Sequence, residues 1–182
     1  MNMTVPWVVM GCGLLIVAAC ATDEGDDVPI GGGPNDTSRC SESADTCVGE
    51  TVCVAGSCVA AYPRIYAISS INVTVPTTKS DGTPWDIGGG APDLFVQVNV
   101  NGTLTGISSV KADAFSASFA GPFPAPLIAG STLVLSALDE DLTVDDPAYS
   151  CAAAPLSMAQ LRGRQLSCGS GGYQMTFRVE PQ

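Results

Sequence analysis

The last 120 or so residues alternate between apolar and polar side chains, and no other feature of the chain constrains its fold as strongly. The alternation has a period of two in the segments 71–75, 94–100 and 173–179, and Leu133, Leu135 and Ala137 form one face of a fourth segment. Successive side chains of a β-strand point to opposite faces, so such strands bury one face and expose the other. The pattern predicts an all-β domain, an antiparallel β-sandwich, over residues 61–182.

Turn-forming residues separate these expected strands. Asn101-Gly102 is a strong signal for a hairpin after the second strand. The segment 121–126, Gly-Pro-Phe-Pro-Ala-Pro, is expected to interrupt the sheet. Residues 157–161 could form one helical turn, and no long helix is visible.

Acidic residues gather in two loops beside the expected strands. The segment 139–146 holds five carboxylates in eight residues, directly after an apolar strand, and Asp86 and Asp93 flank the glycines at 88–90. Carboxylates this close repel one another, so they must be solvated or neutralised by a cation. Calcium fits, because it takes about six to eight oxygen ligands in flexible geometry. We predict that the two loops meet around calcium at one end of the sandwich; the alternative is a pair of solvated acidic loops.

The N-terminal residues are typical of an export signal. Residues 5–19 form an uncharged apolar run, too short to span a bilayer comfortably, that ends Val17-Ala18-Ala19-Cys20. This ending resembles the lipobox of bacterial lipoproteins, in which the cysteine is acylated and becomes the mature N-terminus. The resemblance implies a signal peptide over 1–19, lipidation at Cys20 and a lipoprotein of the bacterial cell envelope. Ala21 favours the outer membrane; an ordinary cleaved signal with an incidental cysteine is the alternative.

Charge and composition limit the partners of the mature chain. It has 7 basic and 18 acidic residues, a net charge of −11, and no basic patch, so we expect no binding to nucleic acid. After the lipidated cysteine, residues 20–39 are rich in glycine and acidic side chains. Such a segment cannot bury enough apolar surface to fold, and we expect a disordered tether. The expected partner is therefore the membrane, through the N-terminal lipid anchor.

Six cysteines remain after Cys12 leaves with the signal and Cys20 takes the lipid, and in an exported protein they are expected to form disulfides. Four lie in the segment 40–60, which is too short for a hydrophobic core and needs crosslinks instead. Three pairings of these four are possible, and a zinc site is disfavoured by their wide spacing and by the absence of histidine. The last two are expected to bridge within the sandwich. The six are Cys40, Cys47, Cys53, Cys58, Cys151 and Cys168.

The two acidic motifs together resemble those of C2 domains. In the first motif an aspartate precedes a strand and Asp93 opens it, followed by Leu-Phe-Val; in the second, Asp139-Glu140-Asp141 is followed by Asp145-Asp146. The resemblance covers the last 120 residues and implies an eight-stranded antiparallel sandwich that holds calcium between loops at one end. It implies the ligands Asp86, Asp93, Asp139, Asp141 and Asp146, with Asp145 as a substitute for Asp146.

Three functions compete. The first, which we favour, is a membrane-anchored surface lipoprotein whose calcium-binding domain has a structural, adhesive or interaction role, with calcium-dependent contact to lipid or to a surface protein. The second is an envelope spacer without a ligand. The third is a hydrolase that uses paired aspartates. The chain has no histidine and no Gly-x-Ser-x-Gly motif, so we do not expect an enzyme.

Overall fold

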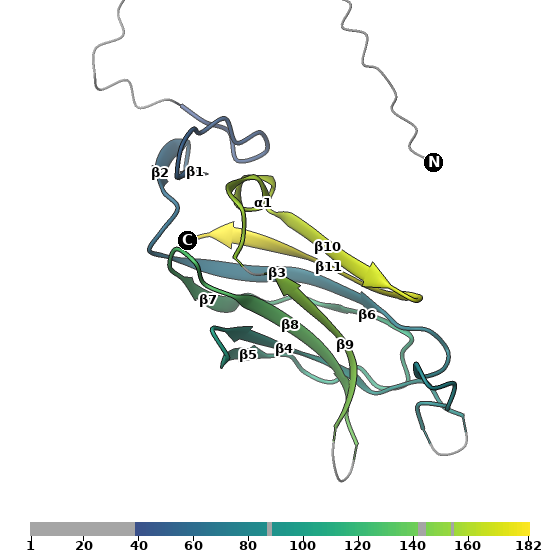
Figure 1. Cartoon of the computed structure of the whole chain (residues 1–182). Coiled ribbons are helices and arrows are strands. Elements are labelled where there is room, and N and C mark those ends of the chain that lie inside the picture. Colours follow the sequence, from purple (N-terminus) through teal and green to yellow (C-terminus); the bar gives the residue numbers. More distant parts are fainter. Residues whose placement is uncertain (1–38, 87–88, 142–144, 154) are drawn as a thin grey trace, which may run out of the picture. The chain divides into compact units, whose positions relative to one another are not determined.

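Two antiparallel β-sheets face each other in the computed structural model, which describes residues 39–86, 89–141, 145–153 and 155–182. One sheet has the order β10–β11–β3–β6, with β7 also paired to β3, and the other has the order β5–β4–β8–β9 (Figure 1). This arrangement confirms the predicted antiparallel sandwich. The strands are β3 (Arg64–Thr74), β4 (Leu94–Val100), β5 (Thr103–Ile107), β6 (Ser116–Phe119), β7 (Phe123–Leu127), β8 (Leu133–Asp139), β9 (Asp146–Ala153), β10 (Gln165–Ser170) and β11 (Tyr173–Pro181).

The core lies between the sheets and is built from the alternating residues seen in the sequence. Every second residue of β8 is buried from Leu133 to Asp139, and β11 buries Met175, Phe177 and Val179. Burying one such aliphatic or aromatic side chain stabilises the fold by about 1.5–3 kcal/mol. Asp139 continues the inward face of β8, so the alternation that builds the core also carries a carboxylate into the interior.

Strand β3 is longer than the sequence pattern predicts because a bulge changes its period. Ile68 and Ile71 are both fully buried although they are three residues apart. Ser70 between them has a positive φ of 48°, and the β11–β3 pairing shifts register at this point. A bulge adds one residue to a strand and resets which side chains face inward.

The proline-rich segment 121–126 does not simply interrupt the sheet, as the sequence led us to expect. Strand β7 forms within it and pairs with β3, so that part of the prediction is wrong. Pro124 and Pro126 are exposed, whereas Ala125 and Leu127 are buried. Proline lacks a backbone N–H, and it is tolerated here because β7 lies at an edge of the sheet.

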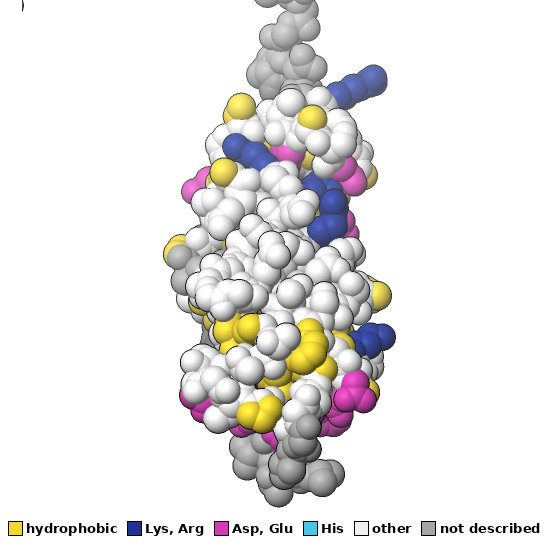
Figure 2. All heavy atoms as spheres, turned by 90° about the vertical axis from the view of Figure 1, so that its right-hand side faces the viewer, with side chains coloured by type: hydrophobic (Ala, Val, Ile, Leu, Met, Phe, Trp, Pro, Cys, Tyr) yellow, Lys and Arg dark blue, Asp and Glu magenta, His cyan; other side chains and the backbone are white. Residues whose placement is uncertain are grey.

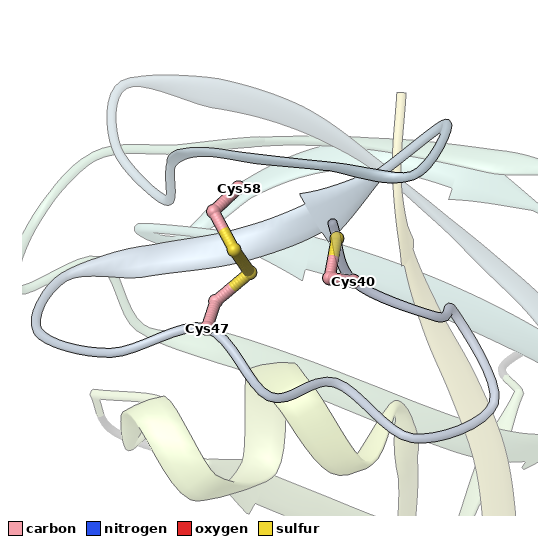
Figure 3. A group of neighbouring side chains, drawn as sticks. All are labelled: Cys40, Cys47 and Cys58. Atoms are coloured by element: carbon pink, nitrogen blue, oxygen red, sulfur yellow. A yellow bond between two sulfur atoms is a disulfide. The ribbon is translucent and has the colours of Figure 1, made fainter. Parts of the chain in front are cut away.

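Residues 39–60 form the disulfide module, whose strands β1 (Thr51–Val54) and β2 (Ser57–Ala60) pair in a sheet of their own. The disulfides Cys40–Cys53 and Cys47–Cys58 select one of the three pairings left open by the sequence. Figure 3 shows Cys40 beside the Cys47–Cys58 bridge. Although these three sulfur atoms lie within 4.8 Å of one another, all three belong to disulfides and are not thiolate metal ligands.

The third predicted disulfide, Cys151–Cys168, is also present and joins β9 to β10. These strands are edge strands of different sheets, so the disulfide covalently crosslinks the two layers of the sandwich. It closes a loop with a sequence separation of 17 residues. In the chain-entropy model a crosslink of this kind contributes about 3 kcal/mol.

The short helix α1 (Met158–Gly163) attaches the disulfide module to the sandwich. Ser157 and Gln160 form a capping box that fixes its start. At its end, Arg162 donates to the carbonyl oxygens of Gly49 and Thr51 in the module. Arg164 Nη2 donates to the Cys53 carbonyl oxygen at 2.5 Å, and Arg164 Nη1 lies 3.4 Å from a Glu42 carboxylate oxygen.

The predicted signal peptide, Cys20 and nearly all of the predicted tether lie outside the described residues. Among the described residues, α1 has only six residues, and no helix has the length and apolar character needed to cross a membrane.

Candidate functional site

Three of the predicted aspartates come together at one end of the sandwich. Asp86, Asp139 and Asp141 each place a carboxylate oxygen within 4.8 Å of the others, and we call this group the carboxylate cluster. Asp139 is the last residue of β8, and Asp141 lies two residues beyond it. Asp86 comes from the connection between β3 and β4, which meets β8 because β4 and β8 are paired and Leu94 lies opposite Asp139.

Asp139 has the most unusual environment in the cluster. Its relative exposure is 0 %, and its Oδ1 atom accepts a hydrogen bond of 2.7 Å from the backbone N–H of Asp93. Its Oδ2 atom is buried and has no hydrogen-bond partner among the described residues. A buried charge is costly unless it is paired, so a cation beside this oxygen would lower the free energy of the ionised carboxylate.

The electrostatics of Asp139 agree with its geometry. Burial raises the pKa of its carboxyl above the ordinary value, and the Asp93 hydrogen bond opposes this effect. The neighbouring carboxylates of Asp86 and Asp141 raise the pKa further, while the Lys79 ammonium lowers it. Removing water and adding like charges both disfavour the ionised form. A cation bound at the cluster would reverse both effects.

The other predicted ligands lie outside the cluster as the structure places them. Asp93 is half-buried, and its Oδ1 atom accepts a hydrogen bond from the backbone N–H of Asp113. Asp145 is exposed, and its Oδ1 atom lies 3.4 Å from the backbone N of Asp141. Asp146 forms an ion pair with Lys79. The side chains of Asp93 and Asp145 therefore bond to the backbone beside the cluster, whereas Asp146 is held by a lysine.

Lys79 also belongs to this end of the domain, and the sequence did not predict its role there. Its hydrogen bond to Asp146, the largest influence, raises the pKa of its ammonium, and the ammonium lies 5.7 Å from the centre of the Trp85 ring. An open pocket of about 460 Å³ is lined by Lys79, Trp85 and Asp146. Tyr149 and Tyr173 also line it, and their rings stack with centroids 5.6 Å apart. The only sequence signal was that Lys79 precedes the first acidic loop.

Charge is distributed unevenly along the domain. Figure 2 shows most basic side chains of this face in its upper part, where acidic side chains lie among them, and a second group of acidic side chains at the lower end. The lower end carries both acidic loops, and the upper end carries the disulfide module (Figure 1). Among the described residues, the acidic end thus holds both the buried carboxylate and the largest concentration of like charge, which favours cations over anions as ligands.

Comparison with known proteins assigns the fold. No protein-family model matches the chain, and no curated protein matches it significantly. Among solved structures, one described as the structure of a C2 domain is 17 % identical, with a TM-score of 0.51 over 65 % of this chain and 98 % of that chain.

Two structures of extended synaptotagmin 2 are also similar. A calcium-bound structure of its two C2 domains is 18 % identical with a TM-score of 0.50, over 65 % of this chain and 45 % of that chain. A structure that contains its SMP domain and both C2 domains is 17 % identical with a TM-score of 0.51, over 65 % of this chain and 27 % of that chain. The sandwich therefore has a C2-like fold.

Proposed function

We propose that the C2-like domain binds calcium through Asp86, Asp139 and Asp141. The observation that carries this proposal is the buried Oδ2 atom of Asp139, which has no hydrogen-bond partner among the described residues. The same carboxylate has an oxygen within 4.8 Å of carboxylate oxygens of two further aspartates. All three groups offer hard oxygen ligands, which suit calcium. The set contains neither nitrogen nor sulfur, which zinc and copper sites usually include. The residues therefore fit a calcium ion.

A bound calcium ion would supply positive charge where three carboxylates meet. Asp139 and Asp141 lie at the end of β8, whereas Asp86 lies in the β3–β4 connection. An ion shared by them would join two segments that are far apart in the sequence and would hold the loops of this end in one arrangement. The role that follows is binding and structural support, for adhesion or interaction, without a chemical step. That one similar solved structure is calcium-bound agrees with this proposal.

We further propose that the protein is a lipoprotein of the bacterial outer membrane, anchored through Cys20. This proposal rests on the Val17-Ala18-Ala19-Cys20 motif. The described chain begins at Arg39 in the disulfide module, at the end of the domain opposite the acidic loops (Figure 1). An anchor before this point would leave the calcium site at the far end from the attachment of the chain. Contact with a second surface, of lipid or of protein, is the interaction this arrangement favours.

A thermal melt of the whole chain in detergent micelles tests calcium binding. Millimolar calcium should raise the melting temperature relative to chelator, because a ligand that binds the native state stabilises it by mass action. The combined substitution Asp139→Asn and Asp141→Asn should remove the increase. The matched control is Asp113→Asn, which changes an exposed aspartate at the same end. No increase for the unaltered chain would contradict the proposal and leave the spacer function.

Lipidation is tested separately by mass spectrometry of the N-terminal peptide from the mature protein in a bacterial host. Acyl chains on Cys20 are expected, and Cys20→Ser should abolish both the acyl mass and the membrane fractionation. A mature N-terminus without acyl chains would contradict the anchor and leave the calcium proposal unaffected.

A further inference from the structure

Asp146 lies beside the carboxylate cluster, yet its side chain is not part of it. In the β8–β9 ladder the residue directly opposite Asp139 is Asp146. Side chains of directly opposed residues are on the same face of a sheet and within reach of each other, and two like charges in this position repel. A change of side-chain rotamer at Asp146 would therefore bring its carboxylate toward the cluster.

Lys79 is what holds Asp146 in its present position. The two side chains form an ion pair, and their relative exposures are 23 % for lysine and 43 % for aspartate. The lysine is presented by an ordered turn, in which its backbone N–H donates to the Thr83 carbonyl oxygen at 2.8 Å and Asp81 accepts from Thr83. The Trp85 ring, 5.7 Å from the ammonium, supports the cation from another side.

We propose that the Lys79 ammonium neutralises the Asp146 carboxylate and keeps it from serving as a calcium ligand, and so limits the site to a single calcium ion. The inference rests on the calcium binding proposed above. Three carboxylates form the cluster, and a fourth, Asp146, lies opposite Asp139 in the ladder and is neutralised by Lys79. A second calcium ion can use Asp146 only by displacing the ammonium, which is itself a cation. Lys79 thereby sets both the number of ions and the affinity of the site.

Calorimetric titration with calcium alone tests the inference on the whole chain in detergent micelles. The unaltered chain is expected to bind one ion. Lys79→Met removes the tethered charge while keeping an unbranched side chain, and it should add a second ion or tighten calcium binding about tenfold, because a unit charge within a few ångströms changes ion binding by this order. Lys79→Gln should act in the same direction.

Lys111→Met is the matched control. It removes the same charge from the only other lysine of the chain, an exposed residue whose backbone pairs with Leu94 near the same end of the domain. It should leave the ion number unchanged and shift the affinity by less than Lys79→Met does. The pair separates a specific effect at Asp146 from the general loss of one positive charge.

The double variant Lys79→Met with Asp146→Asn identifies the carboxylate involved. The gain from Lys79→Met should disappear in this variant, because the released ligand is no longer charged. If Lys79→Met and Lys111→Met bind the same number of calcium ions with the same affinity, the role of Lys79 is overturned while calcium binding itself stands. Calcium binding by Lys79→Met alone, and none by the unaltered chain, would contradict the one-ion site and overturn the inference. No binding by any variant would overturn both proposals.

Discussion

The two ends of the domain each bury a charged side chain, but they surround it differently. At the module end, Arg164 is 6 % exposed and meets the Cys53 carbonyl oxygen and the Glu42 carboxylate; only its Nε atom is buried without a partner among the described residues. At the acidic end, Asp139 is fully buried, and its nearest charged neighbours in the cluster are other carboxylates.

The comparison shows two solutions to the same desolvation cost. Groups of opposite polarity within the chain pair with both terminal nitrogens of the buried arginine, so its charge is compensated without a ligand. Like charges surround the buried aspartate, so its environment raises the free energy of the ionised form instead of lowering it. A bound cation would offset this excess of negative charge around the buried aspartate. Four measurements test this contrast.

The largest effect is expected at the module end, where crosslinks replace a core. Replacing Cys40 and Cys53 by alanine should lower the free energy of unfolding by about 3 kcal/mol, because the unfolded chain regains the freedom that the bridge removed. Chemical denaturation measures the loss. Calcium binding should be retained, because the cluster lies at the opposite end. Loss of calcium binding in this variant would show that the two ends are not independent.

A smaller loss in the free energy of unfolding is expected for Arg164→Leu. The substitution leaves the Cys53 carbonyl oxygen without its donor and should destabilise the protein by about 2 kcal/mol. Arg178→Leu is the control, because Arg178 is 44 % exposed and its ion pair with Glu180 should contribute less than about 0.5 kcal/mol. Equal effects in urea unfolding would mean that the buried arginine is no better compensated than an exposed one.

At the acidic end, the effect of a single substitution on stability should have opposite signs in chelator and in calcium. In chelator, Asp139→Asn should stabilise the protein by about 1 kcal/mol, because it removes a buried charge that its neighbours repel. In millimolar calcium the same substitution should destabilise it, because a charged ligand is lost. Thermal melts in the two buffers measure the reversal. Destabilisation of similar size in both would indicate that Asp139 needs no cation.

The smallest effect is a dependence on pH. The raised pKa of Asp139 means that, between its ordinary and its raised value, the folded state binds more protons than the unfolded state. Its contribution to stability is therefore present below the ordinary aspartate value and is lost as pH rises through the raised one. In chelator, acidification from neutral pH should stabilise the unaltered chain relative to Asp139→Asn.

Asp81 serves as the control of opposite sign. Hydrogen bonds from the Thr83 side chain and backbone hold the pKa of its carboxyl below the ordinary value. The contribution of Asp81 to stability is present above the ordinary aspartate pKa and is lost as pH falls through the lowered one.

For Asp139, a pH profile of stability that is the same with and without Asp139→Asn would contradict the prediction. It would mean that Asp139 ionises as easily in the folded state as in the unfolded chain.

Local pattern was sufficient for the strands that keep a strict period of two. Strands β4, β8 and β11 were visible in the sequence because each buries alternate residues against one core. The full length of β3 was not, since the bulge at Ser70 breaks its period. Strand β7 was missed because the cost of its prolines depends on its edge position, which only the assembled sheet defines.

The candidate site divides in the same way. The amino-acid sequence alone was enough to identify the candidate carboxylates, because their clustering along the chain is a local property. The assembled structure decided that Asp86 joins Asp139 and Asp141, that Asp146 is held by Lys79, and which cysteines pair. These partners are up to dozens of residues apart in the chain, so their distances depend on how the two sheets and their loops pack.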